Sequence, residues 1–353
     1  MLPLFTYIPS ATKYANREAH ESHMPRRSCR IRAAVAAASD GVRRGEFYEN
    51  VGPEHYRRVG APAIGRCVPL AKPDPPTFED ISGLLRDVLQ SLDAASLGRY
   101  VEMLEVEVGK YAGTHVVAVA TQVIGLLFML QAFGVKAGQR AIVPILASAA
   151  AAQAIRQSGA VPTFSEIGDD LTLSPTDLEL PLARHDDVTA VVPVHAHGVP
   201  CNVDRIQEAV DRAARRRAGS IAVVYDAAEG IGGVEAFSPS PPNAFGGLNG
   251  GIVASQHIGH IRCIKKMRNH GLERSGHAYW TGLDGKVSEL HAVVGLASLR
   301  RLPDLMAERQ RKAHAYADRI ERTTSFRLTA RLPSTTTQPF KNFTIVVPPN
   351  PTV

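Results

Sequence analysis

The residues between 221 and 256 hold the clearest candidates for chemistry in this sequence. An apolar run predicts a buried strand at residues 221–225, which leads directly into Asp226. Open α/β sheets bind their ligands at the carboxyl ends of their strands, so Asp226 is expected at a ligand-binding edge. Ser238 follows twelve residues later, and glycines gather at residues 246–251 before the next predicted strand. An acid, a hydroxyl and a glycine-rich turn between two strands indicate a bound cofactor.

The elements that must position these groups alternate regularly along the chain. The hydrophobic periodicity predicts strands at residues 116–120, 140–144, 162–166, 189–194, 221–225, 252–255 and 343–347. It predicts helices at residues 78–92, 100–111, 123–133, 147–158, 204–217, 258–269, 288–302 and 304–323. Ser174 before Pro175 is typical of a further helix start. Strands that alternate with helices at this spacing predict a mostly parallel, doubly wound α/β sheet with helices on both faces.

The positive charge of the chain is concentrated near its start. Residues 1–67 contain 11 Lys and Arg against 6 Asp and Glu, and the net charge of the whole chain is +6, so the remainder carries about +1. Scattered Arg, Pro and His without a sustained period predict a basic, disordered extension at residues 1–67. The rest of the chain shows no interleaving of basic and aromatic residues, and we expect no nucleic-acid partner.

Cysteine content and hydropathy bear on the cellular location of the protein and on whether it contacts a membrane. The four cysteines form no CxxC pair, which favours neither a metal site nor a disulfide framework and fits a cytoplasmic location. The apolar run at residues 116–134 is interrupted by Thr121, Gln122 and Gln131. It is interpreted as a buried strand followed by a buried helix, and no membrane partner is expected.

Several stretches together carry a resemblance to a known family. They are LGRYVEMLEVEVGKYAG at residues 97–113, FGVKAGQRAIVPILASAAAAQAIRQSGAVPTFSEI at 133–167, VVPVHAHGVPCNVDRI at 191–206, VVYDAAEGIGG at 223–233, RNHG at 268–271, SEL at 288–290 and FKNFTIVV at 340–347. In their order and spacing they resemble the DegT/DnrJ/StrS family of pyridoxal 5'-phosphate (PLP)-dependent sugar aminotransferases. The resemblance implies a fold-type-I PLP-transferase-like large domain at residues 68–303 and the start of a truncated small C-terminal domain at residues 304–353.

The resemblance also assigns roles to individual residues. Asp226 would keep the pyridine nitrogen protonated, so that the ring can withdraw electrons from a substrate carbanion. Glu229 stands where the family has a residue beside the ring hydroxyl, and Ser238 would donate to the cofactor phosphate. His195 matches a strand-end histidine of the family. The alternative interpretations are an Asp226 that caps the following turn and a His195 that is a hydrogen-bonded core histidine.

The main departure from the family is the loss of its catalytic lysine. The family places that lysine five residues after the phosphate-binding serine and seven before the paired glycines. Counting from Ser238 and from Gly250 gives the same position, which holds Asn243. An amide nitrogen is not a nucleophile and cannot shuttle a proton. The cofactor, where it binds, is therefore expected to be held non-covalently.

Other parts of the site depart from the family as well. The phosphate-binding turn reads Thr121-Gln122 followed by valine, so it lacks the family's glycine and its threonine hydroxyl. Gln122 is expected to restrict the backbone that glycine would free. Ser148 stands where the family stacks an aromatic ring on the cofactor. Asp284 and Lys286 replace the Asn and Arg of the segment that reaches across the family's dimer.

These observations predict a family member of nucleotide-sugar or secondary-metabolite biosynthesis whose transaminase activity is absent or severely reduced. Its substrate by resemblance is a nucleotide-linked keto sugar, and its expected assembly is a homodimer or a heterodimer with a paralogue. Two alternatives stay open: a non-catalytic partner subunit of an active paralogue, and a lysine-less enzyme that binds PLP or pyridoxamine phosphate non-covalently. A dinucleotide-binding domain is disfavoured, because the glycines at 230–233 lack the order GxGxxG.

Overall fold

The computed structural model describes residues 74–91, 97–228, 235–237, 249–273, 275–323, 326–328 and 342–346. The chain divides into two units, Met1–Val68 and Pro69–Val353. The first unit, and with it the predicted extension at residues 1–67, lies outside the described residues. All the elements below belong to the second unit.

The first of two four-stranded sheets is entirely parallel. It is formed by β2 (Arg140–Pro144), β3 (Val161–Ser165), β4 (Val188–Val191) and β5 (Ala222–Val223), in the order β3-β2-β4-β5. The crossovers between these strands contain α5 (Ala149–Gln157), α6 (Pro175–Arg184) and α7 (Val203–Arg217). Ser174 caps α6 by accepting a hydrogen bond from the backbone N–H of Asp177 at 3.3 Å, as its place before proline predicted.

The second sheet follows on from the first and contains one reversed strand. It has the order β1-β8-β7-β6, with β1 (His115–Val119), β8 (Gly251–Ser255), β7 (Glu235–Phe237) and β6 (Tyr225–Asp226). β6 and β7 are parallel, whereas β8 runs antiparallel to both of its neighbours. The strand predicted at 221–225 is divided into β5 and β6, and Val224 between them donates to the carbonyl of Val191 at 3.0 Å. The sheets are therefore continuous in hydrogen bonding, and the mostly parallel α/β prediction is confirmed.

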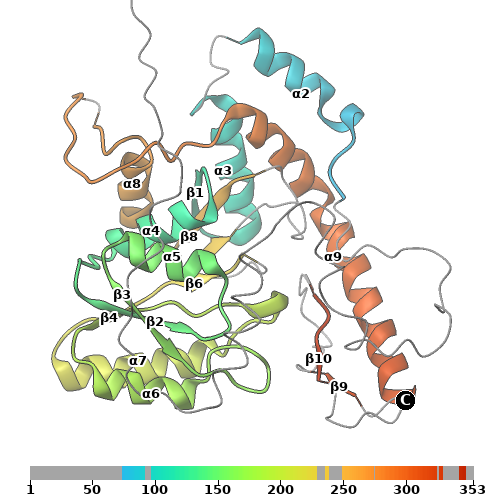
Figure 1. The fold of residues 1–353 in the computed structure, drawn as a ribbon. Coiled ribbons are helices and arrows are strands. Elements are labelled where there is room, and N and C mark those ends of the chain that lie inside the picture. Colours follow the sequence, from blue (N-terminus) through green and yellow to red (C-terminus); the bar gives the residue numbers. More distant parts are fainter. Residues whose placement is uncertain are drawn as a thin grey trace, which may run out of the picture. The chain divides into compact units, whose positions relative to one another are not determined.

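Helices cover both faces of the sheets (Figure 1). On one face α4 (Gln122–Ala132), α5 and α8 (Ile258–Met267) pack against the strands in a single apolar cluster. On the other face α6 and α7 cover β2 and β4, and α3 (Arg99–Ala112) and α9 (Glu289–Thr323) cover β1 and β8. The adjacent residues Val117 and Ala118 of β1 belong to clusters on opposite faces, because side chains alternate along a strand.

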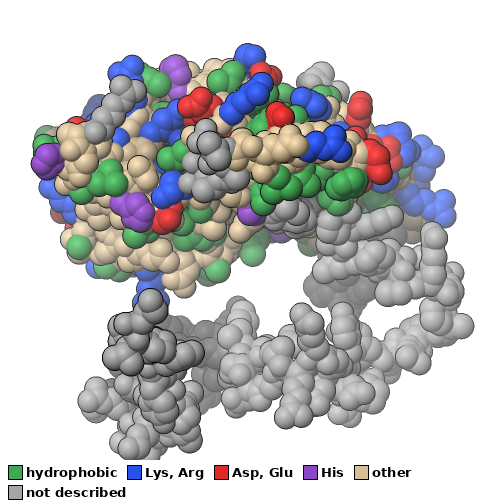
Figure 2. Space-filling view, turned by 90° about the horizontal axis from the view of Figure 1, so that it is seen from above, with side chains coloured by type: hydrophobic (Ala, Val, Ile, Leu, Met, Phe, Trp, Pro, Cys, Tyr) green, Lys and Arg blue, Asp and Glu red, His purple; other side chains and the backbone are tan. Residues whose placement is uncertain are grey.

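The apolar run at 116–134 forms the buried strand and buried helix that its interruptions predicted. Six consecutive residues of α4, Gly125 to Leu130, are buried, so this helix is surrounded by protein on nearly every side. None of the helices in the described part of the chain combines the length and the apolar content needed to span a bilayer. On the face shown in Figure 2, basic and acidic side chains stand next to each other in several places.

The helices predicted at 288–302 and 304–323 are one helix, so that expectation was wrong. α9 is 35 residues long and continues through Pro303. Proline lacks the N–H of the helical hydrogen bond and normally ends or kinks a helix, which is why the sequence suggested a break. Leu302 and Met306 on either side of it are both buried in the cluster that α9 forms with α2 (Phe78–Gln90) and α3. Tertiary packing therefore holds both halves in one helix.

Two further features of the second unit are a helix cap supplied by Glu289 and a short pair of strands. Glu289, the first residue of α9, is buried and accepts hydrogen bonds from the backbone N–H groups of Gly98 at 2.9 Å and Tyr100 at 2.7 Å. It therefore caps α3 from another helix, since Gly98 has no side chain to do so. The strand predicted at 343–347 is seen as β10 (Ile345–Val346), which pairs antiparallel with β9 (Arg327–Leu328).

Candidate functional site

Asp226 lies at the carboxyl end of β6, where the apolar run before it predicted. Its backbone N–H donates to the carbonyl of Pro193 at 2.8 Å, and its own carbonyl accepts from the N–H of His195 at 3.0 Å. Only 1% of the residue is exposed to solvent. The main chain of two adjacent strands thus holds a buried carboxylate at the sheet edge where α/β proteins bind ligands.

Among the described residues, Gln122, Ser148 and Ala228 donate hydrogen bonds to this carboxylate. The side-chain amide of Gln122 and the backbone N–H of Ala228 donate to Oδ1, the latter at 3.1 Å. The hydroxyl of Ser148 donates to Oδ2 at 3.1 Å. A buried carboxylate needs such partners, because the water that would solvate it is excluded. The contact of Gln122 and Ser148 with Asp226 joins the N-terminal ends of α4 and α5 to the end of β6.

The predicted phosphate-binding turn is the N-terminus of α4. Thr121 is the N-cap, and its hydroxyl accepts from the backbone N–H of Ile124 at 3.2 Å. Gln122 is the first helical residue and does not have a positive φ, so the expected restriction of its backbone is not what distinguishes this turn. The free N–H groups of a helix N-terminus attract anions. What differs from a glycine here is the side chain, which reaches Asp226.

Gly251 explains part of the glycine-rich run before β8. A Cβ atom at this position would lie 2.5 Å from the carbonyl oxygen of Thr121 and 2.8 Å from the backbone N of Gln122. Real Cβ atoms do not approach backbone atoms so closely, so only glycine allows β8 to pass beneath the turn. Gly251 therefore allows the N-terminus of α4 to lie directly against the start of β8.

Ser148 is the N-cap residue of α5, but its side chain does not cap that helix. Its hydroxyl bonds Asp226 instead. Sequence comparison placed Ser148 where the family has a stacking aromatic ring, and it gave no indication of this contact with the acid. The missed signal is its position in the short segment between the end of β2 and the start of α5.

His195 has the contacts of a hydrogen-bonded core histidine. It is buried, and its Nδ1 accepts from the backbone N–H of Cys201 at 3.2 Å with the Cys201 sulfur at 3.3 Å. Its ring stacks on Tyr225 with 5.4 Å between the centroids. These contacts match the alternative interpretation of His195, and its catalytic assignment stays a prediction.

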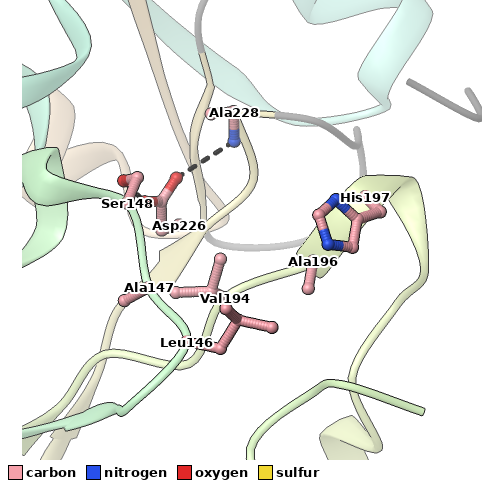
Figure 3. Close-up of a pocket in the computed structure, with 8 residues that line it drawn as sticks. All are labelled: Leu146, Ala147, Ser148, Val194, Ala196, His197, Asp226 and Ala228. Carbon is pink, nitrogen blue, oxygen red and sulfur yellow. Dashed lines mark hydrogen bonds between the residues drawn. The ribbon is translucent and has the colours of Figure 1, made fainter. Parts of the chain in front are cut away.

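A pocket of about 220 Å³ lies beside Asp226. Its described lining is mainly apolar, with three groups of polar character: Ser148 and Asp226 on one side and the imidazole of His197 on the other (Figure 3). The apolar lining consists of Leu146, Ala147, Val194, Ala196 and Ala228. The arrangement of an apolar cavity with a few convergent polar groups is typical of a small-molecule site.

His197 is a site residue that the sequence did not single out. It has a φ of +58°, a left-handed conformation that is uncommon for a residue other than glycine. Its Nδ1 lies 3.1 Å from the side-chain nitrogen of Asn342. Backbone strain of this kind concentrates at ligand sites. The usable signal was its place two residues beyond His195, in the loop that follows a strand end.

The remaining predicted site residues are not among those that surround Asp226 in the described part of the chain. Glu229, Ser238 and Asn243 fall outside the described residues. Lys286 and Asp284 form an ion pair at 2.6 Å, and the hydrogen bond from the Lys286 ammonium holds the pKa of the Asp284 carboxyl below its usual value. Within the described ranges, no group of three His, Cys, Asp or Glu residues is arranged to bind a metal ion.

The described residues fit a ligand with an acid-bound ring nitrogen and an anionic group. A buried carboxylate supplies the partner for a protonated nitrogen, and a helix N-terminus within side-chain reach of it supplies the anion site. The fold is a mostly parallel α/β sheet, and the site is a buried acid at the edge of that sheet close to a helix N-terminus. The structure of S. venezuelae DesV in complex with a ketimine intermediate is similar, with a TM-score of 0.68, 25% identity and coverage of 78% of each chain.

The chain belongs to the DegT/DnrJ/EryC1/StrS aminotransferase family, whose sequence model matches residues 77–351. A curated relative is the UDP-N-acetyl-3-dehydro-alpha-D-glucosamine 3-aminotransferase of Acidithiobacillus ferrooxidans, 28% identical over 253 residues, or 67% of each protein. The PLP form of the putative sugar aminotransferase Spr1654 from Streptococcus pneumoniae shares the fold, with a TM-score of 0.69, 20% identity and coverage of 78% of this chain and 77% of that one. The matched region spans 66–67% of the length of the first curated relatives.

Proposed function

We propose that this protein is a PLP-binding member of the sugar-aminotransferase family whose own transaminase activity is absent or severely reduced. The observation that carries the proposal is the pair formed by a buried Asp226, which accepts hydrogen bonds from Gln122, Ser148 and Ala228, and the Asn243 that stands in the lysine position of the sequence. Asp226 preserves the part of the site that binds the cofactor, whereas Asn243 replaces the lysine that would react with it. Family membership supports the same interpretation.

The residues of the chain have distinct tasks in this proposal. Asp226 accepts a hydrogen bond from the protonated ring nitrogen and keeps that nitrogen charged, so that bound PLP can withdraw electrons from a substrate carbon. Thr121, at the N-terminus of α4, and Ser238 hold the phosphate. The apolar wall around Leu146 and Val194 excludes water from the ring. Glu229 lies beside the ring hydroxyl, and binding is reversible because no lysine holds the cofactor covalently.

The substrate class follows from the relatives. One of them acts on a UDP-linked keto sugar, so a nucleotide-linked keto sugar is the proposed ligand of the same pocket. The side-chain amide of Asn243 is not a base at neutral pH and cannot take a proton from a substrate carbon. By analogy with other enzymes that have lost a nucleophile, the rate falls by about 10⁴-fold or more.

The proposed assembly is a cytoplasmic homodimer, or a heterodimer with an active paralogue. The same cradle serves either a lysine-less enzyme or a non-catalytic partner subunit. The two are distinguishable: a lysine-less enzyme converts substrate alone, whereas a partner subunit changes only the activity of the paralogue with which it co-purifies.

The test combines cofactor retention with turnover. The purified chain is incubated with PLP and divided; one half is dialysed directly and the other after reduction with borohydride. We expect the cofactor to be lost from both halves and turnover of a nucleotide-linked keto sugar with an amino donor to be at least about 10⁴-fold below that of an intact relative. Cofactor attached to one unique lysine after reduction, or turnover equal to the relative's, would show that the proposal is wrong.

A further inference from the structure

The contact between Gln122 and Asp226 joins the two ends of the proposed cofactor site. Gln122 is the first residue of α4, and its side-chain nitrogen donates to Oδ1 of an aspartate 104 residues further along the chain. The backbone N–H of Ala228 donates to the same oxygen at 3.1 Å. A carboxylate oxygen offers two lone pairs, so these two donors use both lone pairs of Oδ1.

We propose that Gln122 is an internal competitor of the cofactor: its side-chain amide takes the place on Asp226 that a protonated pyridine nitrogen requires, and it must move away before the ring is bound. The inference rests on the proposed function, because it concerns the same cradle. Without cofactor, the acid Asp226 is bound by a side chain of the protein itself. That side chain belongs to Gln122 at the phosphate-binding turn, which thereby controls access to Asp226.

The first argument is chemical. One N–H of the Gln122 amide and the N–H of a pyridinium ring each approach a carboxylate oxygen along a lone-pair direction. Two donors cannot share one such direction. A buried carboxylate also makes stronger hydrogen bonds than an exposed one, because water does not compete for it. Removing the Gln122 amide therefore removes one donor that competes for this acceptor.

The second argument is spatial. The side chain of Gln122 runs from the anion-attracting N-terminus of α4 to Asp226. A ligand that places its phosphate at the first point and its ring nitrogen at the second must cover the same path. The pocket beside Asp226 measures about 220 Å³, which is below the roughly 300 Å³ at which ligand pockets typically begin. Gln122 is not among the described residues that line this pocket, so the competition concerns the path between the helix N-terminus and Asp226 and not the pocket volume.

The third argument is that glutamine can move away. Its side chain has three rotatable bonds, and Gln122 is half-buried rather than enclosed. Its backbone is held independently, because Thr121 caps the helix and Gly251 supports the turn from below. The turn therefore keeps its shape when the side chain changes rotamer.

The test measures PLP affinity by absorbance titration and by calorimetry on the full-length chain. Gln122→Ala removes the donor, and Gln122→Asn keeps an amide but shortens its reach, so that one informative variant remains where the other fails to fold. Gln131→Ala, in the last turn of the same helix, is the matched control. The strength of hydrogen bonds to charged groups predicts that both Gln122 variants bind PLP about 10-fold to 100-fold more tightly than the wild type, and Gln131→Ala binds as the wild type does.

The outcomes separate the inference from the proposal on which it rests. Unchanged or weaker PLP binding in both Gln122 variants, with measurable binding in the wild type, overturns the inference and leaves the proposed function standing. If neither the wild type nor the Gln122 variants bind PLP, both fail. Inorganic phosphate is the ligand control: it has no ring, and its affinity is expected to be the same in the wild type and in Gln122→Ala. An equal gain for phosphate and for PLP also overturns the inference.

Discussion

Replacing Arg268 by methionine tests how the α4 turn is anchored. Arg268 follows α8, and its Nη1 contacts Glu105 Oε1 at 2.5 Å and the carbonyl of Ala118 at 2.5 Å. The backbone N–H of Ala118 donates to the same Glu105 oxygen at 3.1 Å. The arginine and glutamate side chains are only 8% and 5% exposed. The pair thus ties α3 and α8 to β1, the strand that leads into Thr121.

The size of the effect follows from what Arg268→Met leaves behind. Breaking a buried ion pair by removing one partner typically costs about 3–5 kcal/mol, because the other charge stays buried. Here Lys265 still contacts the second oxygen of Glu105 at 2.7 Å. We therefore expect a loss near the lower end, about 3 kcal/mol in the free energy of unfolding. The double variant with Glu105→Gln should lose less than the sum of the two single variants.

The assay is urea unfolding followed by circular dichroism, with Arg311→Met as the matched control. Arg311 also pairs with a glutamate, Glu308, at 2.8 Å, but both of these side chains are largely exposed to solvent. Its replacement should leave stability unchanged, because exposed ion pairs contribute little. Equal stability of Arg268→Met and Arg311→Met would refute the reasoning that burial sets the importance of the pair.

Three further predictions concern single positions. Asn243→Lys should retain PLP covalently after borohydride reduction, measured by mass spectrometry, whereas Asn243→Ala should behave as the wild type does. Gly251→Ala should lose about 1–3 kcal/mol of stability in urea unfolding, because its Cβ meets Thr121, whereas Gly259→Ala in α8 has open space and should gain about 0.5–1 kcal/mol. Burial raises the pKa of the Cys263 thiol, so at pH 8 iodoacetamide should label it more slowly in the native than in the unfolded chain; equal rates would contradict this.

The sequence predicted the order of elements well because the signals are local. The strand at 140–144 and the cap at Ser174 were placed correctly, since apolar runs and caps depend on neighbouring residues. The expected break near Pro303 was wrong, because the stability of α9 there comes from its packing on α2 and α3. The reversed direction of β8 was equally inaccessible, since a strand's direction depends on which partner it joins.

For the site, the sequence by itself identified Asp226 as the candidate acid and Asn243 at the position where the family has its lysine. Asp226 stands at a strand end because an apolar run precedes it, and Asn243 lacks a nucleophile whatever surrounds it. Only the tertiary structure decided that Gln122 and Ser148 donate to Asp226 and that His197 faces the same pocket. These contacts join residues far apart in the chain at one sheet edge. No local pattern encodes such a meeting, because it is produced by the packing of helices and strands around a common core.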